Sequence, residues 1–154
     1  MAATMAYAWL PRVVRVERAA LPAAVDALNA ARGGQLTLEV VESYAALVEG
    51  SVIAASKALH FVAPEVVPMY DTNVHAAFYG SRMPAKHRRG ERFLEYARAL
   101  RRLVAERHFE SAVRAPLGAA FGAWSVAGAE GLSLTGLSDL RVAELVLFYS
   151  RSAR

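Results

Sequence analysis

GSVIAASKALHFVAPEVVPMYDTNVHAAFYG, residues 50–80, is the stretch of this sequence that decides its fold. Its first part, 51–63, carries one cation, Lys57, and one histidine, His60, among mainly apolar side chains. A helix that is apolar all round is normally buried. We therefore predict a core helix here. Lys57 either extends its ammonium group to the surface or lies in a pocket where burial favours the neutral amine.

Two prolines and an aspartate mark the second part of the stretch. Pro64 and Pro68 end the first helix, and residues 68–75 then predict an extended approach to a new helix with Asp71 at its N-cap. An aspartate before a helix ordinarily serves as a cap. Asp71 therefore has this structural interpretation beside any catalytic one.

A lysine-bearing helix, a proline-containing turn and an Asp-Thr-Asn-Val helix start together resemble the core of the helix-hairpin-helix base-excision DNA glycosylases. The resemblance covers residues 50–80, with Glu49-Gly50-Ser51-Val52 in place of the family's glycine-rich hairpin. It implies that Asp71 is the catalytic carboxylate and that Lys57 is the lysine of the bifunctional members, which add lyase activity. It implies no cofactor here, because a chain without cysteine cannot hold the iron–sulfur cluster of some members.

The chemistry implied by the resemblance suits these residue types. Breaking an N-glycosidic bond develops positive charge on the sugar, which a nearby carboxylate stabilises while it orients water or activates an amine. A lysine in apolar surroundings can attack the sugar carbon and form a Schiff base. In a duplex the target base must first be flipped out. Tyr70, Phe78 or Tyr79 offers a stacking face for that base, although each also fits the core.

Composition sets the general class of the protein. A chain of 154 residues that is 55% hydrophobic predicts one domain with its own core, an irregular arm at 1–19 and a frayed tail at 150–154. The absence of cysteine excludes disulfides and thiolate metal sites, and the four histidines lack metal-ligand spacing, so no metal site is expected. No stretch has the length of a membrane span, and no leader sequence is recognised, so we expect a soluble cytoplasmic protein.

Helical periodicity recurs along the rest of the chain. We expect helices at 21–32, from an N-cap at Thr37 to a stop at Gly50, at 91–110, and at 139–149 after an N-cap at Ser138. A further helix at 117–126 is expected to pack closely, because Gly118 and Gly122 share one face. No convincing strand pair is present. The predicted fold is all-α: a compact, single-domain helical bundle.

Positive charge gathers just after residue 80. Of the 18 basic residues, ten lie in 81–114, although the formal net charge is only +4. Residues 81–92 predict an exposed loop, and part of the charge on the following helix can pair with Glu91 and Glu95. The clustering indicates contacts to the phosphates of duplex DNA. The residues expected to make them are Arg82, Lys86, Arg88, Arg89 and Arg92.

Two other functions fit the same residues. The segment 82–102 also suits a non-catalytic helical module that binds nucleic acid, or a helical protein-interaction domain whose basic face meets an acidic partner. The basic helix also has a plain interpretation as a solvated amphipathic surface. The first expectation is a DNA-binding enzyme that cleaves an N-glycosidic bond with Asp71 and Lys57.

Overall fold

The computed structural model describes residues 15–125, 134 and 136–152, and every regular element in this part of the chain is helical. The all-α prediction is therefore confirmed for the described residues. The elements, in chain order, are η1 (Arg18–Ala20), α2 (Leu21–Arg32), α3 (Leu38–Leu47), α4 (Val52–Val62), α5 (Thr72–Tyr79), η2 (Lys86–Arg88), α6 (Arg89–Val104), the π-helical turn η3 (Glu110–Arg114), α7 (Ala115–Ser125) and α8 (Asp139–Ser152).

Side-chain caps explain where four of these helices begin. Thr37 accepts a hydrogen bond from the Val40 amide at 3.2 Å at the start of α3. The equivalent bonds are made by Ser51 at α4, Asp71 at α5 and Ser138 at α8. Such a cap satisfies an amide that has no partner inside the helix. The N-caps expected from the sequence at Thr37, Asp71 and Ser138 are all confirmed.

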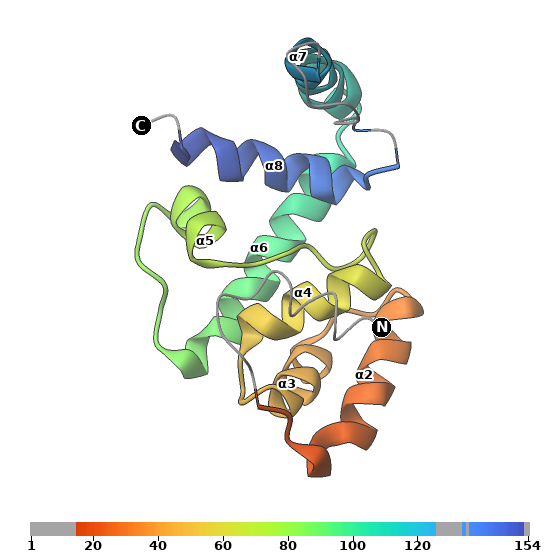
Figure 1. The fold of residues 1–154 in the computed structure, drawn as a ribbon, viewed down its shortest axis with the longest axis vertical. Helices are drawn as coiled ribbons and strands as arrows, with labels where there is room; N and C mark the ends of the chain where they lie inside the picture. Colours follow the sequence, from red (N-terminus) through yellow and green to blue (C-terminus); the bar gives the residue numbers. More distant parts are fainter. Residues whose placement is uncertain (1–14, 126–133, 135, 153–154) are drawn as a thin grey trace.

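The helices form two groups with an extended segment between them (Figure 1). α2 and α3 pack together at one end and α4 crosses the middle, while α5 and α8 lie on the other side and α6 runs behind both groups. The chain between α4 and α5 passes between α4 and α8. Two helices joined by a proline-containing turn were expected across residues 51–80, and they are observed.

Aromatic side chains fill the centre of the molecule. Tyr70, from the extended segment, has its ring centroid 5.5 Å from that of Phe93 and 5.6 Å from that of Tyr96, and all three residues are fully buried. Phe78 of α5 meets Tyr96 edge-on at 5.3 Å. Burying such large rings contributes strongly to stability. This cluster ties the extended segment to α6.

The helix predicted at 91–110 is shorter than expected. α6 ends at Val104, and the chain then turns before η3. The Arg114 guanidinium forms an ion pair with Asp139 and donates hydrogen bonds to the carbonyls of Leu134 and Leu137, at 3.2 and 3.0 Å. These contacts join η3 to the start of α8. The loop predicted at 81–92 is also shorter, because η2 and α6 begin within it.

The two C-terminal helices differ from their predictions, α7 in its packing and α8 in its length. α7 projects from the rest of the molecule (Figure 1), and its residues 115, 116, 119 and 120 are exposed. A Cβ at Gly118 would lie at an ordinary 3.7 Å from Leu134, so the expected close packing at this glycine is wrong. The other glycine of the pair, Gly122, has no described surroundings. α8 continues to Ser152, so residues 150–152 are helical rather than a frayed tail.

The expected irregular N-terminal arm, 1–19, falls mostly outside the described residues. Within it, residues 15–19 are exposed, and the Glu17 amide donates to the Leu47 carbonyl at 2.9 Å. Arg18 already belongs to η1. The described end of the arm is therefore attached to α3.

Candidate functional site

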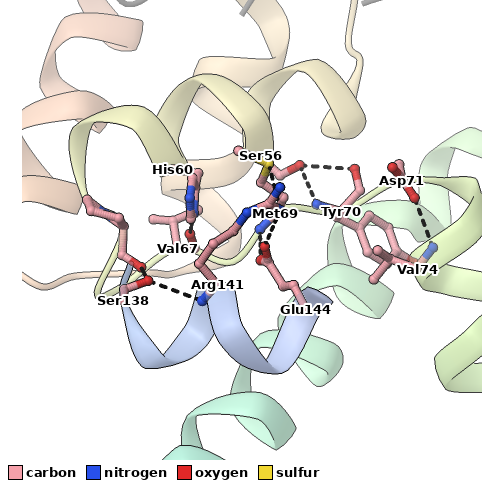
Figure 2. Close-up of polar contacts among 11 residues, drawn as sticks. Ser56, His60, Val67, Met69, Tyr70, Asp71, Val74, Ser138, Arg141 and Glu144 are labelled. Atoms are coloured by element: carbon pink, nitrogen blue, oxygen red, sulfur yellow. Dashed lines mark hydrogen bonds and ion pairs between the residues drawn. The ribbon is translucent and has the colours of Figure 1, made fainter. Parts of the chain in front are cut away.

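The extended segment 67–71 carries the candidate site between α4 and α8. Its residues Val67, Pro68, Met69 and Tyr70 are buried, whereas Asp71 at its end is partly exposed. Buried backbone that belongs to no helix must find hydrogen-bond partners elsewhere. The side chains that supply these partners come from both neighbouring helices (Figure 2).

Ser56 anchors the segment from the α4 side. Its Oγ accepts a hydrogen bond from the Tyr70 amide at 3.1 Å and lies 3.3 Å from the Tyr70 carbonyl oxygen. The hydroxyl proton has the Tyr70 carbonyl or the Ile53 carbonyl, at 3.0 Å, as acceptor. Ser56 is fully buried, so these bonds are shielded from water.

His60 lies one turn further along α4 and makes the next contact. Its Nδ1 is 2.7 Å from the Val67 carbonyl oxygen, so Nδ1 carries the proton and donates it. Burial lowers the pKa of His60 below its ordinary value, with a smaller contribution in the same direction from Arg141. The neutral ring with its proton on Nδ1 therefore holds Val67.

Glu144 anchors the segment from the α8 side. One carboxylate oxygen accepts a hydrogen bond from the Met69 amide, and the other accepts one from the Arg141 guanidinium at 2.8 Å. Burial raises the pKa of Glu144 to about 7, against the opposing effect of Arg141. Ser138 adds a second link from α8, because its hydroxyl donates to the Pro64 carbonyl at 3.0 Å.

Asp71 is placed by these anchors at the end of the buried segment. Its Oδ1 accepts hydrogen bonds from the amides of Asn73 and Val74 at 2.9 and 2.8 Å. Within the described chain, its Oδ2 makes no hydrogen bond. The carboxylate therefore serves as a cap through one oxygen and leaves the other for a further partner.

Tyr96 contributes a buried hydroxyl near both carboxyl groups. Burial raises its pKa well above the ordinary value, and the charges of Glu144 and Asp71 raise it further. Its hydroxyl has no hydrogen-bond partner among the described residues. The site thus combines two carboxyl groups with a hydroxyl that remains protonated at neutral pH.

Lys57 lies on α4 directly after Ser56, and only 9% of its surface is exposed. Ser56 is bonded to Tyr70, which directly precedes Asp71. Lys57 and Asp71 are thus each the chain neighbour of one member of this hydrogen-bonded pair.

No known protein family, curated protein or solved structure matches this chain. The site must therefore be interpreted from its own geometry.

The chain bends sharply between α3 and α4. Val48–Ser51 joins the two helices, whose directions differ by 106°. Two residues of this turn, Glu49 and Gly50, have positive φ angles of 56° and 67°.

No single helix among the described residues meets the length and hydropathy of a membrane span. The α3–α4 pair does so only as a bent pair. Both helices bury most of their apolar side chains in the core.

Lys86 is exposed, and its ammonium group is bonded at the α3–α4 turn. Its Nζ donates to the Glu49 carbonyl, and a Cβ added at Gly50 would lie 2.9 Å from its Cε. An open groove of about 450 Å³ lies beside it, between α3 and the start of α6. The groove is lined by Glu42, Ala45, Ala46, Gly50, Val52, Lys86, His87 and Gly90.

The predicted phosphate-binding arginines differ in their availability. Arg82 and Arg88 are exposed, and their guanidinium groups make no hydrogen bond or ion pair within the described chain. Arg89 is partly buried and donates to the Pro84 carbonyl at 3.0 Å. Arg92 forms an ion pair with Glu95 at 2.7 Å. It also lies 5.2 Å from the centre of the Tyr79 ring.

His75 connects the site to this basic segment. Its Nε2 donates to the Arg82 carbonyl at 3.1 Å, which leaves Nδ1 to accept a hydrogen bond from the Tyr70 hydroxyl at 2.5 Å. Burial lowers the pKa of His75 and raises that of Tyr70. Tyr70, Phe78 and Tyr79 were considered as stacking faces for a base. Tyr70 is fully buried in the aromatic core, whereas Phe78 and Tyr79 are half-buried.

Sequence reasoning missed the anchoring residues Ser56 and Glu144 and the buried hydroxyl of Tyr96. The partners of the two anchors lie far away in the chain: Ser56 is 14 residues from Tyr70, and Met69 is 75 residues from Glu144. The one usable signal was an acidic residue, Glu144, within the apolar run of α8. No group of three metal-ligating side chains lies close together among the residues that the structure describes.

Proposed function

We propose that this protein binds duplex DNA and cleaves an N-glycosidic bond, with Asp71 as the carboxylate that acts at the sugar. One observation carries the proposal. Asp71 is partly exposed at the end of a buried segment that is hydrogen-bonded to α4 and to α8, and its Oδ2 has no hydrogen bond within the described chain. A rigidly placed carboxylate with one available oxygen suits a reaction in which the sugar becomes positively charged.

The contacts of Asp71 support this role. Two backbone amides hold Oδ1, so the carboxylate plane is fixed without a positively charged partner. Oδ2 can then accept a proton from a water molecule or lie beside the sugar. In this proposal Lys57 is the nucleophile that forms a Schiff base. Its place on α4 next to the Ser56–Tyr70 pair supports a position near the same sugar.

The order of the helices and the basic segment support DNA as the substrate. α4, which carries Lys57, follows α3 through a short turn, as the second helix follows the first in the resemblance to the helix-hairpin-helix glycosylases. The exposed Arg82 and Arg88 lie in the chain directly after α5, the helix that Asp71 caps. Unpaired arginines at the surface suit contacts to phosphate.

The test is a panel of duplexes, each with one damaged, modified or mismatched base, followed by alkali to reveal abasic sites. We expect base release from at least one duplex, and Asp71→Asn should slow it about 100-fold or more in single turnover. Asparagine is an equally good N-cap, so folding should be retained. Full release by Asp71→Asn would contradict the proposal.

Thr37→Ala is the matched control for this experiment. It removes a comparable cap from α3, at a cost of about 1 kcal/mol in the free energy of unfolding, without touching the segment 67–71. We expect its release rate to equal that of the parent. A loss of activity in Thr37→Ala as large as in Asp71→Asn would assign the effect to stability instead of chemistry.

A second candidate function is non-catalytic binding of nucleic acid. The exposed guanidinium groups of Arg82 and Arg88 favour it, because they need no catalytic residue to act. Salt-sensitive binding to the duplexes without release of any base would support this candidate over the enzyme.

A further inference from the structure

We infer that Glu144 is a positioning residue: its carboxylate fixes the segment 67–71 to α8 and thereby sets where the Asp71 carboxylate lies. The inference concerns catalysis only if the proposed function of Asp71 holds. Its structural part concerns the free protein and can be tested without DNA.

The position of Glu144 excludes a direct role at a substrate. Only 1% of its surface is exposed, and its two oxygens are occupied by the Met69 amide and the Arg141 guanidinium. A group enclosed in this way acts through what it holds. It holds Met69, two residues before Asp71.

Ser56 alone does not fix this segment from both sides. The Ser56 hydroxyl holds Tyr70 against α4, and the Glu144 carboxylate holds Met69 against α8 (Figure 2). The successive residues Met69 and Tyr70 are thus hydrogen-bonded to helices on opposite sides of the segment. Loss of the Glu144 bond leaves the Met69 amide buried and unpaired, which favours movement of the segment away from its place.

Arg141 keeps the Glu144 carboxylate in the orientation that receives Met69. Its Nη1 lies 2.8 Å from the second carboxylate oxygen and 3.3 Å from the Met69 sulfur. The other titratable groups near Glu144 and Arg141 are Asp71 at the N-cap of α5, Tyr96 on α6 and His60 on α4. Burial raises the pKa of Tyr96, and the charges of Glu144 and Asp71 raise it further, so Tyr96 stays a neutral hydroxyl.

Glu144→Gln is the direct test, because glutamine has the same shape but only one acceptor oxygen. The Met69 amide and the Arg141 guanidinium must compete for that oxygen, so one bond is lost. Val142→Ala is the matched control, since Val142 is a fully buried α8 residue without a polar contact to the segment.

Amide hydrogen exchange of the free protein gives the first readout. We expect the Met69 and Val74 amides to exchange about ten-fold faster or more in Glu144→Gln than in Val142→Ala. Val74 donates to Asp71 and therefore reports the position of that carboxylate. Equal Val74 exchange in the two variants would overturn the inference.

A titration of the unmodified protein covers the case in which Glu144→Gln does not fold. The Met69 amide proton should change its chemical shift with the same midpoint as the Glu144 carboxyl carbon, near pH 7. A Met69 amide chemical shift that stays constant while Glu144 titrates would also overturn the inference.

Base release gives the second readout. Glu144→Gln should slow single-turnover release about 10- to 100-fold at unchanged DNA affinity, because a displaced Asp71 misaligns the reaction. The dependence of the release rate on pH near 7 should also be lost in Glu144→Gln. Val142→Ala should keep both the release rate of the parent and its pH dependence. Unchanged release by Glu144→Gln would overturn the catalytic part. If no variant or parent releases any base but Val74 exchange rises only in Glu144→Gln, the proposed function fails and the structural part stands.

Discussion

The hydroxyl of Ser56 lies within hydrogen-bonding distance of both backbone polar atoms of Tyr70, at 3.1 Å from the amide nitrogen and 3.3 Å from the carbonyl oxygen. This pair joins the middle of α4 to the last buried residue before Asp71. Lys57 follows Ser56 and Asp71 follows Tyr70, so the pair joins the chain neighbours of the two predicted catalytic residues.

Replacing Ser56 with alanine should lower the free energy of unfolding by about 1–3 kcal/mol, because the buried Tyr70 amide loses its acceptor. Urea denaturation measures the change. Ser111→Ala is the control, since Ser111 is exposed and bonds only to the nearby His108 carbonyl. It should change stability by less than about 0.5 kcal/mol. Equal effects of the two substitutions would show that the Ser56–Tyr70 bond adds nothing.

Glu144 should make the stability of the protein depend on pH. Its pKa is raised from 4.5 to about 7 on folding, so the folded state binds a proton more tightly than the unfolded state. The resulting stabilisation is complete below about pH 4.5 and is lost as the pH rises through about 7. At about 1.4 kcal/mol for each pH unit, this range corresponds to about 3 kcal/mol.

Comparison with Glu144→Gln isolates this effect in denaturation curves recorded over the same pH range. His60 and His75 act in the opposite sense, because their lowered pKa values give stability above about pH 6.5 that is lost on acidification. Both histidines are present in each protein, so their contribution cancels in the difference. A difference that does not change with pH would mean that Glu144 titrates at its ordinary value.

Binding to duplex DNA should be sensitive to salt, and it should depend most on Arg82 and Arg88. Each phosphate contact contributes a slope of about −0.9 to log affinity against log salt, so the double substitution Arg82→Ala/Arg88→Ala should flatten the slope by about 1.8. Arg92→Ala should flatten it less, since Glu95 already pairs with Arg92. Fluorescence anisotropy at several salt concentrations measures the slopes.

Arg32→Ala controls for the loss of one positive charge. Arg32 is exposed at the end of α2, away from the basic segment (Figure 1). It should leave the slope unchanged. A slope that responds to Arg32 as strongly as to Arg82 or Arg88 would move the DNA-binding surface to another face.

Borohydride should trap a covalent protein–DNA adduct during base release, because a Schiff base from Lys57 is reducible. Lys57→Gln should abolish the adduct, as seen by its loss on a denaturing gel. Lys86→Gln is a matched control, since these two residues are the only lysines of the chain. It should retain the adduct. If Lys57→Gln keeps full base release without any adduct, Asp71 activates water and Lys57 is not the nucleophile. The melting temperature of each variant checks that it is folded.

Local signals in the sequence were sufficient for the helices and their caps. Thr37, Asp71 and Ser138 act within three residues of themselves, so their effect can be predicted without knowledge of the fold. The same holds for the end of α4 before Pro64. The predicted end of α6 is wrong: the helix ends at Val104, and the chain turns before η3, where Arg114 bonds to Asp139, a partner 25 residues away.

The candidate site was predictable only in part, because several of its contacts join residues far apart in the chain. Asp71 and Lys57 stand out by their local setting, an N-cap and an apolar helix. Ser56 and Glu144 do not stand out in this way. A serine in a helix and a single acid in α8 can be recognised as anchors only when the segment 67–71 is seen to lie between the two helices. The basic segment was recognised by its charge. Pairing with Glu91 and Glu95 was expected, but that Glu95 pairs with Arg92 depended on side-chain positions in the folded helix.

The hydrogen bonds between the segment 67–71 and α8 also bear on the order in which parts of the fold form. The hydrogen bonds from Met69 to Glu144 and from Ser138 to Pro64 span 75 and 74 residues. Contacts this distant in the chain carry a high loop-closure cost and form late in folding. During synthesis, α2, α3 and α4 are made long before α8, so Pro64 and the segment 67–71 emerge before their partners Ser138 and Glu144 exist. The place of Asp71 is therefore set only once the C-terminal helix has been made and has packed against the rest of the molecule.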